Sequence, residues 1–74
     1  MAWDIEWAAE RAAEAMRYLA ANYPECSASE ELHPHQEAAH EASLVEDRGG
    51  YLEALRGFMR AGRDEALRIR KEAA

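Results

Sequence analysis

The sequence predicts an all-α protein, a small three-helix bundle with up-down-up topology. The bundle is either compact in itself or completed by self-association. The chain has 74 residues, a length that suits one small domain over 1–74. Its apolar residues recur three and four positions apart, which is the spacing of amphipathic helices. The connections between these patterns are short, and short connections place consecutive helices antiparallel.

The first helix is predicted over about residues 4–22. Asp4 suits an N-cap or first-turn position, and the residue before Pro24 is pushed out of helical geometry, so the helix ends near Tyr23. An apolar face with heptad-type spacing is expected to meet the core; its members are Ile5, Ala9, Ala12, Met16, Leu19 and Tyr23.

The second helix is predicted over about residues 34–48, after a loop over 24–33. Pro34 suits the first helical position, with His33 as its cap. The apolar face contains His35, Ala38, Ala42 and Val45. The pair Gly49-Gly50 is expected to end this helix.

The third helix is predicted over about residues 51–72. Its apolar face contains Leu52, Leu55, Met59, Gly62, Ala66 and Ile69. The spacing keeps its phase through Gly62, which favours one continuous helix with a close helix–helix approach at that glycine. A break at Gly62 is the alternative.

The core predicted from this composition is thin. Hydrophobic residues make up 49% of the chain, but 17 of them are alanines. Such small side chains favour close helix packing or a core completed by a second copy. Cys26 has no partner for an internal disulfide, and no signal-peptide or membrane-length apolar segment is present, so a cytoplasmic protein that does not enter a membrane is expected.

The segment HPHQEAAH over 33–40 raises the question of a metal site. His35 and His40 are five positions apart, so one straight helix cannot direct both at one ion. Glu37 and His40 do share a face, as in the E-x-x-H pairs of di-iron bundles, but a twofold dimer with Glu10 or Glu14 would be needed to complete such a site.

The preferred interpretation of this segment is a solvated helix start with no metal and no cofactor. His35 is expected to be half-buried at the edge of the core. Glu37 and His40 are the ligands in the alternative, a metal-binding dimer, and whether His33, His35 or His40 binds a metal is left open.

No catalytic motif is recognisable, so a non-enzymatic protein is expected. Ser27, Ser29 and Ser43 lie in no nucleophile motif, and no glycine-rich phosphate loop occurs. Cys26 follows Glu25 and lacks the positive surroundings that lower a thiol pKa.

Three aromatic residues, Trp3, Trp7 and Tyr18, lie opposite the apolar face predicted for the first helix. In one interpretation the tryptophans fold over the end of the bundle or cap the third helix. In the other, all three anchor a protein contact, together with Leu44 on the outer face of the second helix.

The charge is unevenly distributed. The formal net charge is −6, but residues 1–55 carry −9 and residues 56–74 carry +3. Residues 25–47, called here the acidic segment, contain seven acids and no Lys or Arg. We expect an arginine row on the third helix to neutralise the acidic second helix; its members are Arg56, Arg60, Arg63 and Arg70.

These features favour a protein-binding module that does not bind nucleic acid directly, since its pI is about 4.9. The specific expectation is a small regulator or inhibitor, of phage or mobile-element type and anti-CRISPR-like in kind, that occupies a basic, nucleic-acid-handling surface of another protein. Its contact residues would be Trp3, Trp7, Tyr18, Glu30, Glu31, Glu37, Glu41, Leu44, Glu46 and Asp47. A metal-binding dimer and a structural homo-oligomer are the alternatives.

Overall fold

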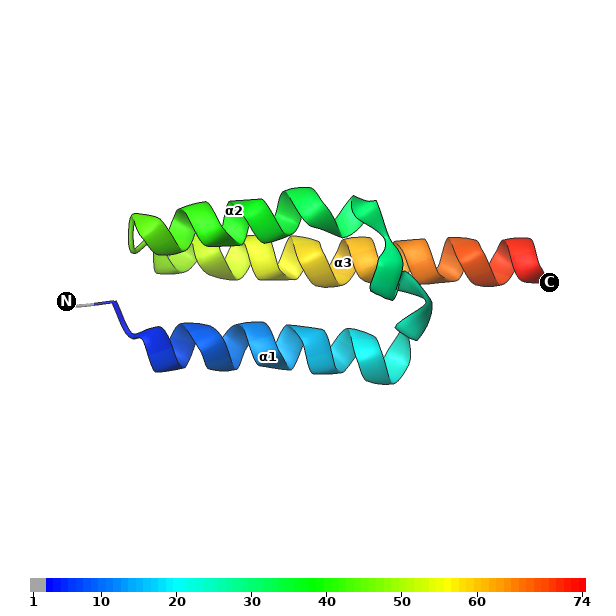
Figure 1. Ribbon diagram of the computed structural model, residues 1–74, viewed down its shortest axis with the longest axis horizontal. Coiled ribbons are helices and arrows are strands. Elements are labelled where there is room, and N and C mark those ends of the chain that lie inside the picture. Colours follow the sequence, from blue (N-terminus) through cyan, green and yellow to red (C-terminus); the bar gives the residue numbers. More distant parts are fainter. Residues whose placement is uncertain (1–2) are drawn as a thin grey trace.

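The protein is an all-α three-helix bundle with up-down-up topology, as the sequence predicts. The computed structural model describes residues 3–74, in which three α-helices are joined by short connections (Figure 1). Helix α1 spans Ile5–Asn22, α2 spans His33–Leu44 and α3 spans Arg48–Ala73. Two short 3₁₀ helices, η1 (Pro24–Ala28) and η2 (Glu30–Leu32), make up most of the connection between α1 and α2.

Helix α3 is the common support of the other two helices. Both α1 and α2 pack against it along their lengths, whereas α1 and α2 scarcely touch each other. With 26 residues, α3 is about 39 Å long and extends past the connection between α1 and α2 (Figure 1). The bundle is therefore open along one side.

The turn between α2 and α3 lies earlier than predicted. Helix α2 ends at Leu44, and Glu46 adopts the left-handed conformation (φ 56°) that a glycine was expected to supply. Asp47 then caps α3, because its side chain accepts a hydrogen bond from the Gly50 amide at 3.0 Å. The prediction that Gly49-Gly50 ends α2 is wrong, since the cap places both glycines in the first turn of α3.

The apolar face predicted for α3 is confirmed in part. Leu55, Gly62 and Ala66 are buried. Leu52, Met59 and Ile69 are only half-buried, and Tyr51, Ala54 and Phe58 are buried although they were not predicted.

Helix α3 is unbroken at Gly62. A Cβ atom at Gly62 would lie 2.7 Å from both methyl groups of Leu19 and 3.2 Å from the sulfur of Cys26. Gly62 is therefore the close-approach point that the sequence predicts, where α1 and η1 both meet α3.

The apolar face predicted for α1 is confirmed only in part. Leu19 is buried, and Ala12 and Tyr23 pack against the core. Ile5, Ala9 and Met16 are exposed.

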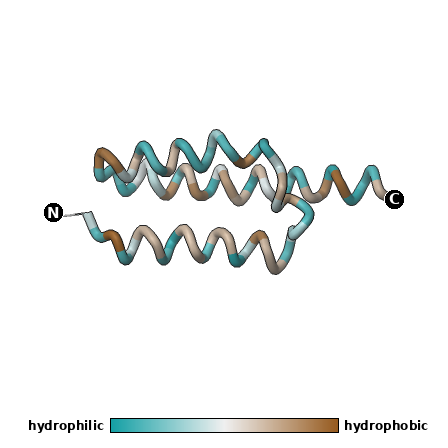
Figure 2. Tube along the Cα trace, viewed as in Figure 1, coloured by the Kyte–Doolittle hydropathy of each residue, from teal (hydrophilic) through white to brown (hydrophobic). Residues whose placement is uncertain are grey.

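The residues that pack on α3 are Ala8, Ala15 and Leu19, with Trp3 and Trp7 beside them. Ile5 and Met16 are 74% and 56% exposed instead. Hydrophobic residues thus occur on more than one side of this helix (Figure 2), and α3 covers only the side that carries the tryptophans.

Helix α2 contributes little to the core. Ala39 is buried, and His35 is half-buried as predicted, with its ring against Gly57 of α3. Ala38 and Val45, which were expected on the apolar face, are exposed. Both errors follow from the helix ending at Leu44 and packing through His35 and Ala39.

The junction between α1 and the connection is fastened to α3 by Arg70. Its guanidinium donates to the Glu25 carboxylate at 2.6 and 3.0 Å and to the carbonyl of Asn22 at 2.7 Å. It also lies over the ring of Tyr23, 5.2 Å from the centroid. The hydrogen bond from Arg70 holds the pKa of Glu25 below its usual range.

Within residues 3–74, no helix is at once long enough and apolar enough to cross a membrane.

Replacing Gly62 should destabilise the bundle. The branched side chain of Gly62→Val would overlap Leu19 and Cys26, so we expect the free energy of unfolding to fall by about 2 kcal/mol. Gly49→Val is the matched control, because a Cβ atom there meets nothing closer than 3.7 Å. Urea unfolding followed by circular dichroism measures both, and equal stabilities of the two variants would contradict the packing at Gly62.

The Glu25–Arg70 ion pair should make stability depend on pH. A depressed folded-state pKa means that the carboxylate stabilises the fold at neutral pH, and that this contribution is lost as the pH falls through the usual glutamate range to the depressed pKa. We expect Glu25→Gln to be less stable than the native protein at pH 7 and equally stable in acid. Glu53→Gln, which also removes one carboxylate but breaks only an exposed pair within α3, is the control for the change in charge.

Candidate functional site

An open groove runs between α1 and α2, with α3 as its floor. It has a volume of about 460 Å³. The α1 wall is formed by the exposed apolar face described above, chiefly Ile5, Ala9 and Met16. Leu55 and Phe58 of α3 lie at the bottom. Four of the six residues that were predicted to pack inside the protein thus line an open surface, which we call the α1–α2 groove; they are Ile5, Ala9, Ala12 and Met16.

The α2 wall of the groove is more polar than the α1 wall. Gln36, His40 and Ser43 line it, together with Ala39. Gln36 and His40 also border an adjoining hollow with Glu37 and Glu41. The groove is therefore continuous with the acidic outer face of α2.

An aromatic cluster closes one end of the groove. Trp3 packs edge-on to Trp7 and to Tyr51, with ring centroids 5.9 and 5.4 Å apart. Arg48 lies over the Trp7 ring at 4.2 Å, and the Tyr51 hydroxyl donates a hydrogen bond to the carbonyl of Ala8 at 2.6 Å. This cluster joins the start of α1 to the start of α3, as in the interpretation in which the tryptophans cap the third helix.

The predicted contact residues do not form one surface. Trp3 and Trp7 are half-buried, whereas Tyr18 is 41% exposed and borders a separate hollow between α1 and α3. Leu44 is 69% exposed. The predicted acids are all exposed, on η2, on α2 and in the following turn; they are Glu30, Glu31, Glu37, Glu41, Glu46 and Asp47.

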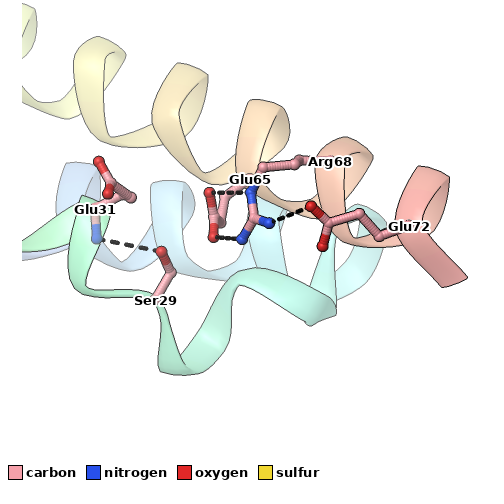
Figure 3. Close-up of polar contacts among 5 residues, drawn as sticks. All are labelled: Ser29, Glu31, Glu65, Arg68 and Glu72. Carbon is pink, nitrogen blue, oxygen red and sulfur yellow. Dashed lines mark hydrogen bonds and ion pairs between the residues drawn. The ribbon is translucent and has the colours of Figure 1, made fainter.

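The acids of α2 are not neutralised by the arginines of α3, contrary to the prediction. Arg56 and Arg63 bind acids of α3 itself, and Arg70 binds Glu25. Arg68, outside the predicted row, binds Glu65 and Glu72 of the same helix (Figure 3). Arg56 and Arg68 pair with acids three or four positions along the helix, which are within reach without any contact between helices.

The acids of α2 and its flanks are consequently left without strong counter-charges. Among the described residues, no Lys or Arg forms an ion pair with any of the six predicted acids. Glu37 lies 3.2 Å from the Nε2 atom of His33, which carries a charge only when it is protonated. The side chain of Asp47 is occupied in capping α3.

The histidine-rich segment does not assemble a metal site within one chain. Glu37 pairs with His33, four positions before it, and His40 faces the groove. Over residues 3–74, no three His, Cys, Asp or Glu side chains are grouped so that they could hold an ion. The metal-binding dimer would need every further ligand from a second copy.

Cys26 has the environment of a structural thiol. It is buried beside Leu19 and Gly62, and burial, reinforced by the nearby charges of Glu25 and Glu65, raises the pKa of the thiol. A raised pKa lowers the thiolate fraction and therefore the reactivity.

No known protein family, curated protein or solved structure matches the chain. We therefore infer its function from its own residues and their arrangement.

The hydrogen bond from Tyr51 should matter for the shape of the groove, because it ties α1 to α3 beside the groove's closed end. Tyr51→Phe keeps the packing of the ring but removes the donor, so we expect a loss of about 1 kcal/mol in the free energy of unfolding. Tyr18→Phe is the control, since Tyr18 is exposed. Thermal unfolding of the two variants measures the difference, and an unchanged midpoint for Tyr51→Phe would show that the bond contributes nothing.

Proposed function

We propose that this protein is a non-enzymatic binding module whose acidic segment contacts a basic surface of a partner protein. The observation that carries the proposal is the exposure of six acids with no Lys or Arg partner among the described residues; they are Glu30, Glu31, Glu37, Glu41, Glu46 and Asp47.

Such a concentration of charge is unfavourable for the isolated fold. Like charges repel one another, and three of the α3 arginines that were expected to relieve the repulsion are engaged elsewhere: Arg56 and Arg63 pair within α3, and Arg70 pairs with Glu25. A basic partner surface supplies the missing counter-charge. The unrelieved acids are thus better explained by binding than by stability.

Electrostatic attraction between the acidic segment and a basic surface chiefly increases the association rate. A rigid array of carboxylates is attracted to a positive surface over about 8 Å at physiological salt, and steering of this kind speeds association. Basic surfaces of this kind commonly bind nucleic-acid phosphates. The specific role that we propose is therefore a regulator or inhibitor that occupies a basic, nucleic-acid-handling surface.

Zero-length coupling tests where the contact lies. A carbodiimide joins carboxylates to lysine amines only where the two groups touch, and mass spectrometry identifies the coupled residues. We expect the acids of the segment, such as Glu37 and Glu41, to couple to lysines of one recovered partner. Coupling spread evenly over the acids of α1 and α3 would contradict the proposal.

Charge reversal then tests the energetic contribution. Replacing Glu37, Glu41 and Glu46 by Lys should weaken binding to that partner by about tenfold or more and should flatten its salt dependence. The control reverses Glu14, Glu53 and Glu72, which gives the same formal net charge from acids outside the segment. Because these three acids pair with Arg11, Arg56 and Arg68, circular dichroism must confirm that the control folds. If the first variant binds as tightly as the native protein, with the same salt dependence, the acidic segment is not the contact.

A further inference from the structure

We propose that the α1–α2 groove binds an amphipathic helix with basic flanks, contributed by the partner protein. This inference rests on the proposed function and adds to it the form of the bound segment. The groove supplies the apolar contact, and the acids beside it supply the contact with the basic flanks.

The α1 wall of the groove carries apolar side chains that the fold leaves exposed. Ile5 and Met16 are largely exposed on α1, and Ala9 lies between them on the same face. These residues follow the heptad-type spacing with which a helix packs against another helix. From Ile5 to Met16 the wall is about 16 Å long, enough for three turns of a bound helix.

The accessible surface of the chain is larger than that expected for a compact monomer of its mass. It measures 5203 Å², whereas a compact monomer of 8.3 kDa is expected to expose roughly 4,600 Å². The difference of about 600 Å² belongs to the elongated shape of the chain as a whole. The end of α3 that projects beyond the other two helices contributes to this surface (Figure 1).

Small side chains make the groove suitable for a helix. Ala9 and Ala12 on one wall and Ala39 and Ser43 on the other allow the backbone of a bound helix to come close. A helix lying over the groove would contact both α1 and α2. It would convert the open three-helix arrangement into a closed four-helix one.

The charges beside the groove determine which helix fits. Successive residues of a helix are 100° apart, so Glu6 flanks the apolar face of α1 and Glu37 flanks the groove side of α2. Glu10 and Glu41 lie one turn further along and are turned about 40° further from the groove. Of the Lys and Arg residues on these two helices, Arg17 lies 3.8 Å from Glu10. His35 and His40 line the groove itself. Acids on both sides favour a bound helix with Lys or Arg on both flanks.

A second copy of this chain is the main competing occupant. Each copy carries a net charge of −6, and its exposed helix faces carry the same acids as the groove flanks. Self-association would therefore bring like charges together, whereas a basic helix would neutralise them.

A synthetic helix of leucine and lysine tests the proposal directly. The leucines follow heptad-type spacing and the lysines occupy the flanks; one control peptide has the same composition in scrambled order, and another carries glutamate in place of lysine. Trp3 lines the groove, so its fluorescence reports occupancy. We expect one amphipathic lysine peptide to bind per chain, and neither control peptide to bind comparably.

A groove variant separates this inference from the proposed function. Ala9→Gln places a neutral amide on the apolar wall, and because Ala9 is exposed, the core is untouched. We expect it to weaken binding of the lysine peptide at least tenfold, while Ala21→Gln, exposed on α1 but outside the groove lining, changes it less than twofold. Circular dichroism confirms that both variants fold.

Each other outcome overturns the inference in a recognisable way. If the Ala9→Gln and Ala21→Gln variants bind the lysine peptide equally well, the groove is not used. The same conclusion follows if the scrambled peptide binds as well as the amphipathic one. In both cases the charge-reversal experiment still decides the proposed function. Native mass spectrometry in the absence of peptide gives the oligomeric state. A dimer of the native protein that becomes a monomer in the Ala9→Gln variant would assign the groove to a second copy.

Discussion

The structure depends on one constraint: α1 and α2 pack on α3 and scarcely on each other. Helix α3 must therefore present suitable surfaces to two helices at once. Tyr51, Leu55 and Phe58 fill the space between them, and Gly62 allows α1 and η1 to approach further along. Because no contact closes the opposite side of the bundle, the walls of α1 and α2 that face each other remain exposed.

The phase of α1 follows from the same constraint. This helix carries apolar residues on two sides, and α3 can cover only one of them. The covered side brings two tryptophans against Tyr51, under Arg48, and it gains the hydrogen bond from Tyr51 to the Ala8 carbonyl. Large aromatic side chains bury more apolar surface than isoleucine, alanine and methionine do, so their side faces α3 and leaves Ile5 and Met16 outside.

The sequence was sufficient to predict the helices and the continuity of α3, because local periodicity determines both. It was not sufficient where two local signals competed. Gly49-Gly50 has the composition of a helix end, yet the cap from Asp47 and the left-handed Glu46 place the turn before it. The groove could not be predicted for a related reason, since heptad-type spacing on α1 identifies a packing surface without identifying its partner. The feature of the sequence that could have indicated the groove is the presence of apolar residues on two sides of α1, because one neighbouring helix can cover only one side.

Helix geometry separates the charges that are paired within the fold from those that, over residues 3–74, are left without a Lys or Arg partner. The arginines of α3 have acids within one turn of their own helix, so most of their charge is satisfied locally or, for Arg70, in fastening the end of α1. The acids of α2 have no such neighbours except His33. An apolar groove and an uncompensated acidic face therefore adjoin on the same helix. The charges would favour encounter with a basic partner, and the groove would select among such partners by requiring an apolar helix face of matching spacing.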